Sequence, residues 1–271
     1  MAASRIPIAL VRQRRRYRYR FARHRANRLD QEEKNVISMS DHADVPPRIK
    51  IWDAPTRLFH WVLLVACIIA WLTATRFNTT STMRWHLLAG YVTLALLLFR
   101  LLWGIWGSSN NHFAYLWREA ANIPGYLPTL FQRHSHYRIG HNPLGSLAVM
   151  LLLLAVASVT VTGLFTNDAV STAGPWAHLV SDASSETLSA WHAESFDILA
   201  ALVALHVGAI LFYRFFKYDD LLSPMITGDK PLPPETETMP ECVQMASNLR
   251  ALMFFLLAAS VTTLIAFTPG Q

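Results

Sequence analysis

Charged residues and cysteines are both scarce in this sequence. Only 15% of its 271 residues are charged, whereas 52% are hydrophobic, and there are two cysteines. This composition excludes an ordinary water-soluble domain and is typical of an integral membrane protein. One cysteine lies in an apolar run and the other in a polar loop, so a disulfide framework is also excluded.

What the sequence does contain is five apolar runs of membrane-spanning length. Each has about 17–23 residues, and at about 1.5 Å per residue a helix of that length crosses a hydrocarbon core of about 30 Å. We expect helices at residues 56–75, 86–106, 143–165, 191–213 and 251–267. Asp53 is the expected N-cap of the first, and Pro55 fits its first turn. The sequence therefore predicts an all-α fold, an integral membrane helical bundle.

Basic residues are unevenly distributed along the chain. No Lys or Arg occurs from Ile139 to Tyr213, whereas ten arginines lie between Arg5 and Arg28. By the positive-inside rule, we expect the N-terminus in the cytoplasm and the C-terminus on the outer side. The basic residues flank spans rather than form a fold of their own. Nucleic-acid binding is therefore not expected, and membrane lipid is the expected contact.

Residues 1–47 are expected to form a disordered basic and polar segment, because they are too basic to bury a core. Two interpretations stay open: a tail that binds anionic lipid, or an over-extended start with Met39 as the true initiator. The other predicted limits are 48–230 for the membrane domain, 231–250 for a cytoplasmic linker and 251–271 for a C-terminal transmembrane helix and tail.

Four histidines lie inside or at the edge of the apolar runs: His60, His86, His192 and His206. A histidine in hydrocarbon is costly and usually has a bound partner or a function. His60 and His206 each lie about 10 Å from the cytoplasmic end of their spans. His86 and His192 each lie in the first turn from the outer side. The depths therefore match in two pairs.

The fourth expected span contributes one histidine to each pair. His192 and His206 are 14 residues apart, which places them about 40° apart around the helix and about 21 Å apart along it. Two histidines that meet across a bundle can hold a haem iron from both sides. Two stacked haems fit this pattern, and without a Cys-x-x-Cys-His motif coordination and packing alone would hold them.

Arg100 lies inside the second expected span, 14 residues from His86 and so on the same face, at the depth of the inner pair. A buried cation needs a counter-ion. Two interpretations are open: Arg100 binds a haem propionate, or it extends to the cytoplasmic headgroups about 9 Å away. His141 is expected mainly to help start the third span, and the alternative is that it touches a haem propionate or a quinone.

These residues carry a resemblance to a known family. Over about residues 48–230 the chain resembles the bacterial cytochrome b561 family, which is related to the b-type cytochrome subunit of nickel–iron hydrogenases. The matching segments, in order and at consistent spacing, are Ile51–Trp61, His86–Tyr91, Phe99–Gly104, Gly140–Gly145, Thr162–Phe165, Leu205–Val207 and Leu221–Gly228.

The resemblance implies a dihaem b-type cytochrome of the bacterial cytoplasmic (inner) membrane with a four-helix core. The Arg-rich leader and the fifth, C-terminal helix of this chain depart from the family. The two haem b groups would be non-covalent and bis-histidine, held by His60 with His206 and by His86 with His192. Arg100 is the further cofactor contact expected from its position in the second span. The protein would transfer electrons in a respiratory chain between quinone or quinol and a redox partner such as a c-type cytochrome, with quinol oxidation as the candidate enzyme activity.

Other functions compete with this interpretation. One is the membrane-anchor subunit of a hydrogenase-like oxidoreductase. Another is a histidine-relay proton channel or transporter, which would need further buried carboxylates and broken helices. A membrane di-metal oxidase would need clustered histidine boxes, which the chain lacks. The sequence leaves open the redox partner, the direction of electron flow and whether a homodimer forms.

Overall fold

The computed structural model describes residues 47–77, 79–133, 138–167, 172–232 and 243–267. The chain divides into two units, Met1–Pro47 with Leu232–Pro234, and Arg48–Pro231 with Glu235–Gln271. Every helix and strand described below belongs to the second unit. Met39 and nearly all of the predicted basic segment lie outside the described residues, as does much of the predicted linker.

Among the described residues, five helices are long and apolar enough to cross a membrane: α2 (Ala54–Thr75), α3 (Thr80–Trp106), α6 (Pro143–Gly163), α7 (Asp182–Phe215) and α9 (Asn248–Ala266). The predicted all-α membrane bundle is confirmed. The shorter elements are α4 (Phe113–Ala121), α5 (Ile123–Tyr126), α8 (Leu222–Thr227), the 3₁₀ turns Ser109–Asn111, Leu127–Thr129 and Ala177–Leu179, and the strands β1 (Arg48–Lys50) and β2 (Asp229–Pro231).

Polar caps extend three helices beyond the apolar runs that predicted them. Thr79 and Thr82 form a reciprocal capping box, so α3 begins six residues before His86. Ser181 caps α7, which begins nine residues before Trp191. Ser247 likewise caps α9. Hydropathy locates the part of a helix that crosses lipid, whereas hydrogen bonding at the ends decides where the helix itself begins.

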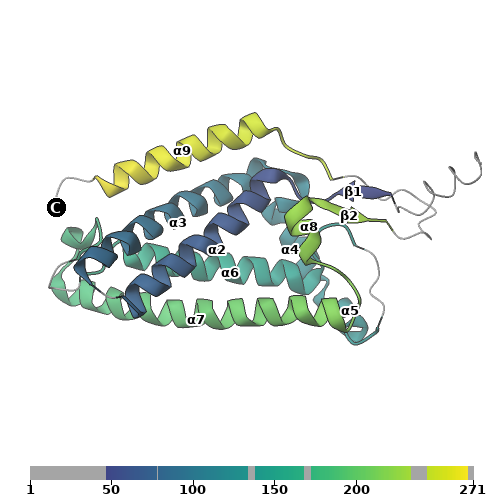
Figure 1. Ribbon diagram of the computed structural model, residues 1–271, viewed down its shortest axis with the longest axis horizontal. Helices are drawn as coiled ribbons and strands as arrows, with labels where there is room; N and C mark the ends of the chain where they lie inside the picture. The colour runs from purple at the N-terminus through teal and green to yellow at the C-terminus, as the bar shows by residue number, and fades with distance from the viewer. Residues whose placement is uncertain (1–46, 78, 134–137, 168–171, 233–242, 268–271) are drawn as a thin grey trace, which may run out of the picture. The chain divides into compact units, whose positions relative to one another are not determined.

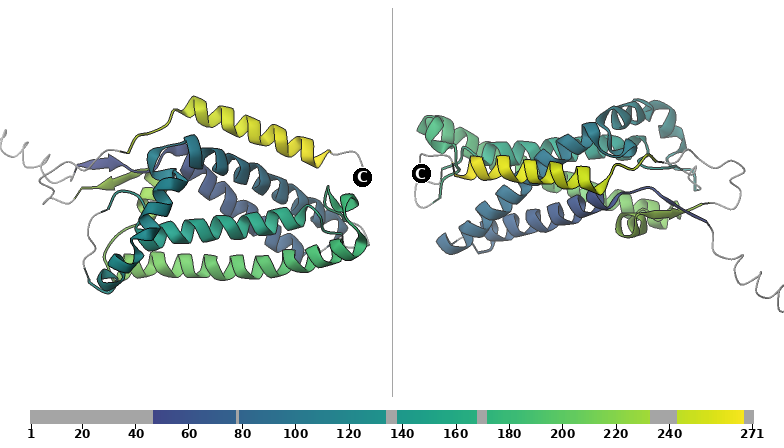
Figure 2. Two further views of the ribbon diagram at one scale, coloured as in Figure 1. Left: turned by 180° about the vertical axis from the view of Figure 1, so that it is seen from behind. Right: turned by 90° about the horizontal axis from the view of Figure 1, so that it is seen from above.

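The spans pack as two antiparallel pairs, α2 with α3 and α6 with α7, and α9 packs on α3 (Figures 1 and 2). One buried cluster joins α2, α3 and α9, and consists of Phe59, Leu96, Phe99, Trp103, Ala251 and Ala258. A second joins α6 and α7 through Ala155, Val156 and Leu199. Leu63 of α2 packs against both clusters and so connects the two helix pairs.

The start of α2 is held by a segment that is distant in sequence. Gly228 caps the C-terminus of α8, and its φ of 93° is a left-handed conformation that favours glycine. The carbonyl of Gly228 accepts hydrogen bonds from the N–H groups of Ile51 and Trp52, at 2.8 and 3.0 Å. Trp61, the residue after His60, donates its indole N–H to the carbonyl of Met225 at 3.2 Å. These bonds fix the end of α2 that carries His60.

Candidate functional site

His86 on α3 and His192 on α7 lie opposite each other at one end of the bundle, the end expected from the sequence to be the outer one. Their ring centroids are 6.1 Å apart and the ring planes are 78° apart. The Nδ1 of His86 is 2.9 Å from the carbonyl oxygen of Ala70, and the Nδ1 of His192 is 2.9 Å from that of Val159. A carbonyl can only accept, so each Nδ1 carries the proton and each Nε2 keeps its lone pair for a metal.

The spacing of this outer pair suits a metal held between two imidazoles. Two metal–nitrogen bonds of about 2 Å, together with the radii of the two rings, require centroids about 6 Å apart. The carbonyls that hold Nδ1 are the second-shell partners that metal-bound histidines usually have. The centroid spacing of the outer pair is therefore compatible with one iron atom between the two imidazoles.

His60 on α2 and His206 on α7 belong to the inner end of the bundle. His206 lies within electrostatic range of His60. The ring of His60 packs edge-on against that of Trp61, with ring centroids 4.9 Å apart. The Nδ1 of His60 is buried and has no hydrogen-bond partner among the described residues. A buried polar nitrogen without a partner is costly, so a bound group beside it would be stabilising.

Helix α7 carries one histidine of each pair. It is continuous from Asp182 to Phe215, so the 14 residues between His192 and His206 correspond to about 21 Å along its axis. Both side chains are half-buried. The rigid helix therefore fixes the separation between an outer and an inner imidazole site.

Arg100 is buried at the inner end of α3, with only 3% of its surface exposed. Its Nη1 donates to the carbonyl of Asn111 at 3.2 Å, and its guanidinium lies 5.3 Å from the ring centroid of Phe113. The interpretation that Arg100 extends to the headgroups is therefore wrong. The hydrogen bond to Asn111 and the packing on Phe113 hold the side chain inside the bundle instead.

The negative charge of Asp53 stabilises the positive charge of Arg100. Only 4% of Asp53 is exposed. Its Oδ1 accepts the N–H of Thr56 at 2.7 Å, which confirms the expected N-cap of α2. Its Oδ2 accepts from three more side chains, namely Trp103 at 3.2 Å, Asn111 at 3.4 Å and Ser108. Asp53 thus joins α2 to the end of α3.

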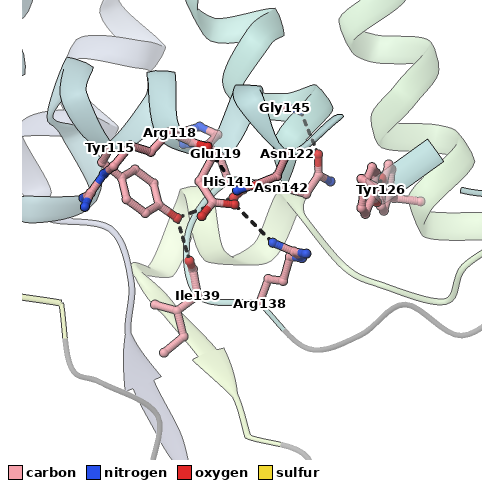
Figure 3. A network of polar contacts seen from close by, with 11 residues as sticks. Tyr115, Arg118, Glu119, Asn122, Tyr126, Arg138, Ile139, His141, Asn142 and Gly145 are labelled. Atoms are coloured by element: carbon pink, nitrogen blue, oxygen red, sulfur yellow. Dashed lines mark hydrogen bonds and ion pairs between the residues drawn. The ribbon is translucent and has the colours of Figure 1, made fainter. Parts of the chain in front are cut away.

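His141 precedes α6 and lies near the inner histidines. Burial lowers the pKa of His141 to about 3, and the positive charge of Arg100 acts in the same direction. His141 is therefore neutral at pH 7. The cap at the start of α6 comes from Asn142, whose side chain accepts the N–H of Gly145 at 2.7 Å (Figure 3).

The histidine pairs do not form a site for a bare metal ion. Within the described ranges, no three His, Cys, Asp or Glu side chains come together as a metal-binding group. Two imidazoles at each level leave the remaining coordination positions to be filled by a cofactor, as the four nitrogens of a porphyrin do. The donor set therefore suits haem better than zinc or a di-metal centre.

Sequence reasoning placed the four histidines and Arg100 but missed the roles of two residues. The sequence assigned Asp53 only to the cap of α2. The other three side chains that donate hydrogen bonds to Asp53 follow it by 50 residues or more, so no local pattern indicates them. The sequence also could not show that Gly163, at the end of α6, lies against His192, where an added Cβ would be only 3.0 Å from Cε1 of the ring. The matched segment Thr162–Phe165 was the available signal for this second contact.

Comparison with known proteins gives a family and two relatives. The family model described as prokaryotic cytochrome b561 matches residues 51–228. A probable Ni/Fe-hydrogenase B-type cytochrome subunit of Bradyrhizobium diazoefficiens is 24% identical over 214 residues, 68% of this chain and 86% of the relative. One of the same description from Cupriavidus necator is 24% identical over 212 residues, 66% and 85% of the two chains. No solved structure gives a significant match.

Proposed function

This chain belongs to the prokaryotic cytochrome b561 family, and from that premise we propose that it is a dihaem membrane cytochrome that transfers electrons between the quinone pool and a redox partner protein. Membership of a b-type cytochrome family implies haem b. The observation that carries the proposal is the facing pair His86 and His192, with ring centroids 6.1 Å apart and both Nδ1 atoms bound to carbonyls.

The proposed ligands are His86 with His192 for the outer haem and His60 with His206 for the inner haem. Haem supplies a reversible one-electron couple of its iron, whose potential depends on axial ligands, burial and nearby charge. The carbonyls of Ala70 and Val159 hold the outer imidazoles in the ligating tautomer.

Arg100 is proposed to act on the inner haem through its charge. It is buried on the inner part of α3, and Asp53 is already occupied by four donors. A haem propionate would be a second anionic partner for the guanidinium. The positive charge of Arg100 would favour the reduced, less positive form of the iron.

The proposed setting is the bacterial inner membrane, with the N-terminus in the cytoplasm and the C-terminus in the periplasm. Five apolar helices support a multi-pass membrane protein, and the absence of Lys and Arg from Ile139 to Tyr213 supports the orientation. A second candidate function is the membrane subunit of a hydrogenase, which both named relatives favour. A quinone and a redox partner protein are compatible both with a stand-alone cytochrome and with a hydrogenase subunit.

Reduction by quinol tests the proposed function directly. Purified protein in lipid nanodiscs is mixed anaerobically with a short-chain ubiquinol or menaquinol, and the reduced haem α-band is followed. We expect either quinol to reduce a substantial part of the haem that dithionite reduces. Haem that dithionite reduces but that neither quinol reduces would contradict the quinone part of the proposal.

Gly163 gives a testable link between α6 and the outer haem. An alanine Cβ at this position would lie 3.0 Å from Cε1 and 3.1 Å from Nδ1 of His192, a ring already held by Val159. We expect Gly163→Ala to cost about tenfold in affinity for the outer haem, the magnitude typical of second-shell changes. The measurement is haem loss during titration with apomyoglobin. Gly208→Ala is the matched control, because nothing lies within 4 Å of its added Cβ, and it should lose no haem.

A further inference from the structure

The segment Ile139–Asn142 is held in place from several directions. Tyr115 donates its hydroxyl to the carbonyl of Ile139 at 3.1 Å and to that of His141 at 3.5 Å (Figure 3). Gly140 has a φ of 82°, in the left-handed region that favours glycine. Asn142 then caps α6. The backbone on both sides of His141 is thus fixed by the fold.

The imidazole of His141 is also fixed. Its ring centroid lies 4.7 Å from that of Trp52, and Trp52 itself is held by the carbonyl of Gly228. Only 5% of Trp52 is exposed. The His141 side chain therefore cannot turn outward to find water without breaking this contact.

The Nδ1 of this fixed ring is buried and has no hydrogen-bond partner among the described residues. A buried polar nitrogen without a partner has lost its hydrogen bonds to water and gained none in return, which destabilises the folded state. In the tautomer that carries the proton on Nδ1, this nitrogen is a donor. The fold imposes this cost on a residue whose backbone and ring it holds tightly. A group outside the protein chain that accepts a hydrogen bond would remove the cost.

The charges around His141 indicate which kind of acceptor fits. The positive charge of Arg100 acts on the ring of His141. The nearby acid, Asp53, already accepts four hydrogen bonds. Of the five N–H donors that a guanidinium has, Arg100 gives one to the carbonyl of Asn111. A carboxylate would satisfy His141 and lie in the positive field of Arg100 at once.

We propose that His141 is a positioning residue whose Nδ1–H donates a hydrogen bond to a propionate of the inner haem, beside Arg100. This proposal rests on the proposed function, since it needs a haem at His60 and His206. His141 is no iron ligand in this scheme. It orients the haem through its carboxylate and reduces the negative charge that the propionate presents to the iron.

The test compares His141→Leu with His141→Asn in the full chain. Leucine removes the donor, whereas the amide nitrogen of asparagine lies near the position of Nδ1 and keeps one. In a redox titration, His141→Leu should make reduction of one haem about tenfold less favourable, a fall of about 59 mV for one electron, and leave the other unchanged. His141→Asn should restore most of the shift. Resonance Raman should show the propionate bending mode move in the leucine variant only.

His112→Leu is the matched control, because His112 lies at the same end of the bundle but its Nε2 already has a partner, the carbonyl of Gly107 at 2.9 Å. It should shift neither haem. Loss of the inner haem from His141→Leu with retention in His141→Asn would also support a hydrogen-bonding role. Wild-type potentials in both His141 variants, or loss of the haem from both, would overturn it. Wild-type protein without haem would instead overturn the proposed function.

Discussion

Replacing His192 with alanine should remove the outer haem and leave the inner one in place. The wild-type content of about two haems per chain should fall to about one, because a haem between His86 and His192 would lose one of its two axial ligands. Electron transfer across the bilayer should stop, since the inner haem alone does not reach the outer surface. Haem is counted by the pyridine haemochrome assay, and transfer is measured in vesicles with dye acceptors outside.

His178→Ala is the control for this prediction, because His178 is an exposed imidazole in the same outer part of the chain. It should keep the wild-type haem content. Retention of both haems in His192→Ala would contradict the assignment of the outer pair. Loss of both haems from a variant that still elutes as folded protein would contradict the independence of the two levels.

Replacing Asp53 with alanine should lower the free energy of unfolding more than any other substitution that we propose. The change removes the N-cap of α2 and leaves the donors of Trp103, Ser108 and Asn111 without their acceptor. It also removes the negative charge that stabilises buried Arg100. Removing one partner of such a buried polar and ionic network costs about 3–5 kcal/mol, and we expect the free energy of unfolding to fall by this amount.

Reversible unfolding in mixed micelles of increasing SDS content measures this change. Asp182→Ala is the control, because Asp182 also lies in the first turn of a helix but is exposed. Its loss should cost at most about 1 kcal/mol. An Asp53→Ala variant as stable as Asp182→Ala would show that the polar network contributes little to the fold.

The sequence was sufficient for those features that depend on composition and local pattern. Apolar runs located all five spans, and Asp53 followed by Pro55 predicted the start of α2. Depth within those runs, together with helical periodicity, was enough to match His86 with His192. The structure adds the ring spacing and the two carbonyl partners, which depend on how α3, α6 and α7 pack together.

Contacts between distant segments could not be derived in the same way. The bonds from Ile51 and Trp52 to Gly228 join residues far apart in sequence, and no periodicity encodes such a contact. Arg100 illustrates the same limit. Its spacing from His86 placed it at the right depth, but only the packing around Phe113 and Asn111 shows that it stays inside the bundle.

The central claim is that two imidazole pairs each hold one haem b. Its most direct test is the ratio of haem b to polypeptide in the purified wild-type chain, combined with EPR of the oxidised protein. The account predicts about two haems per chain, both low-spin with two histidine ligands. Well-folded protein that contains one haem or none, or that shows a high-spin iron as purified, would contradict it.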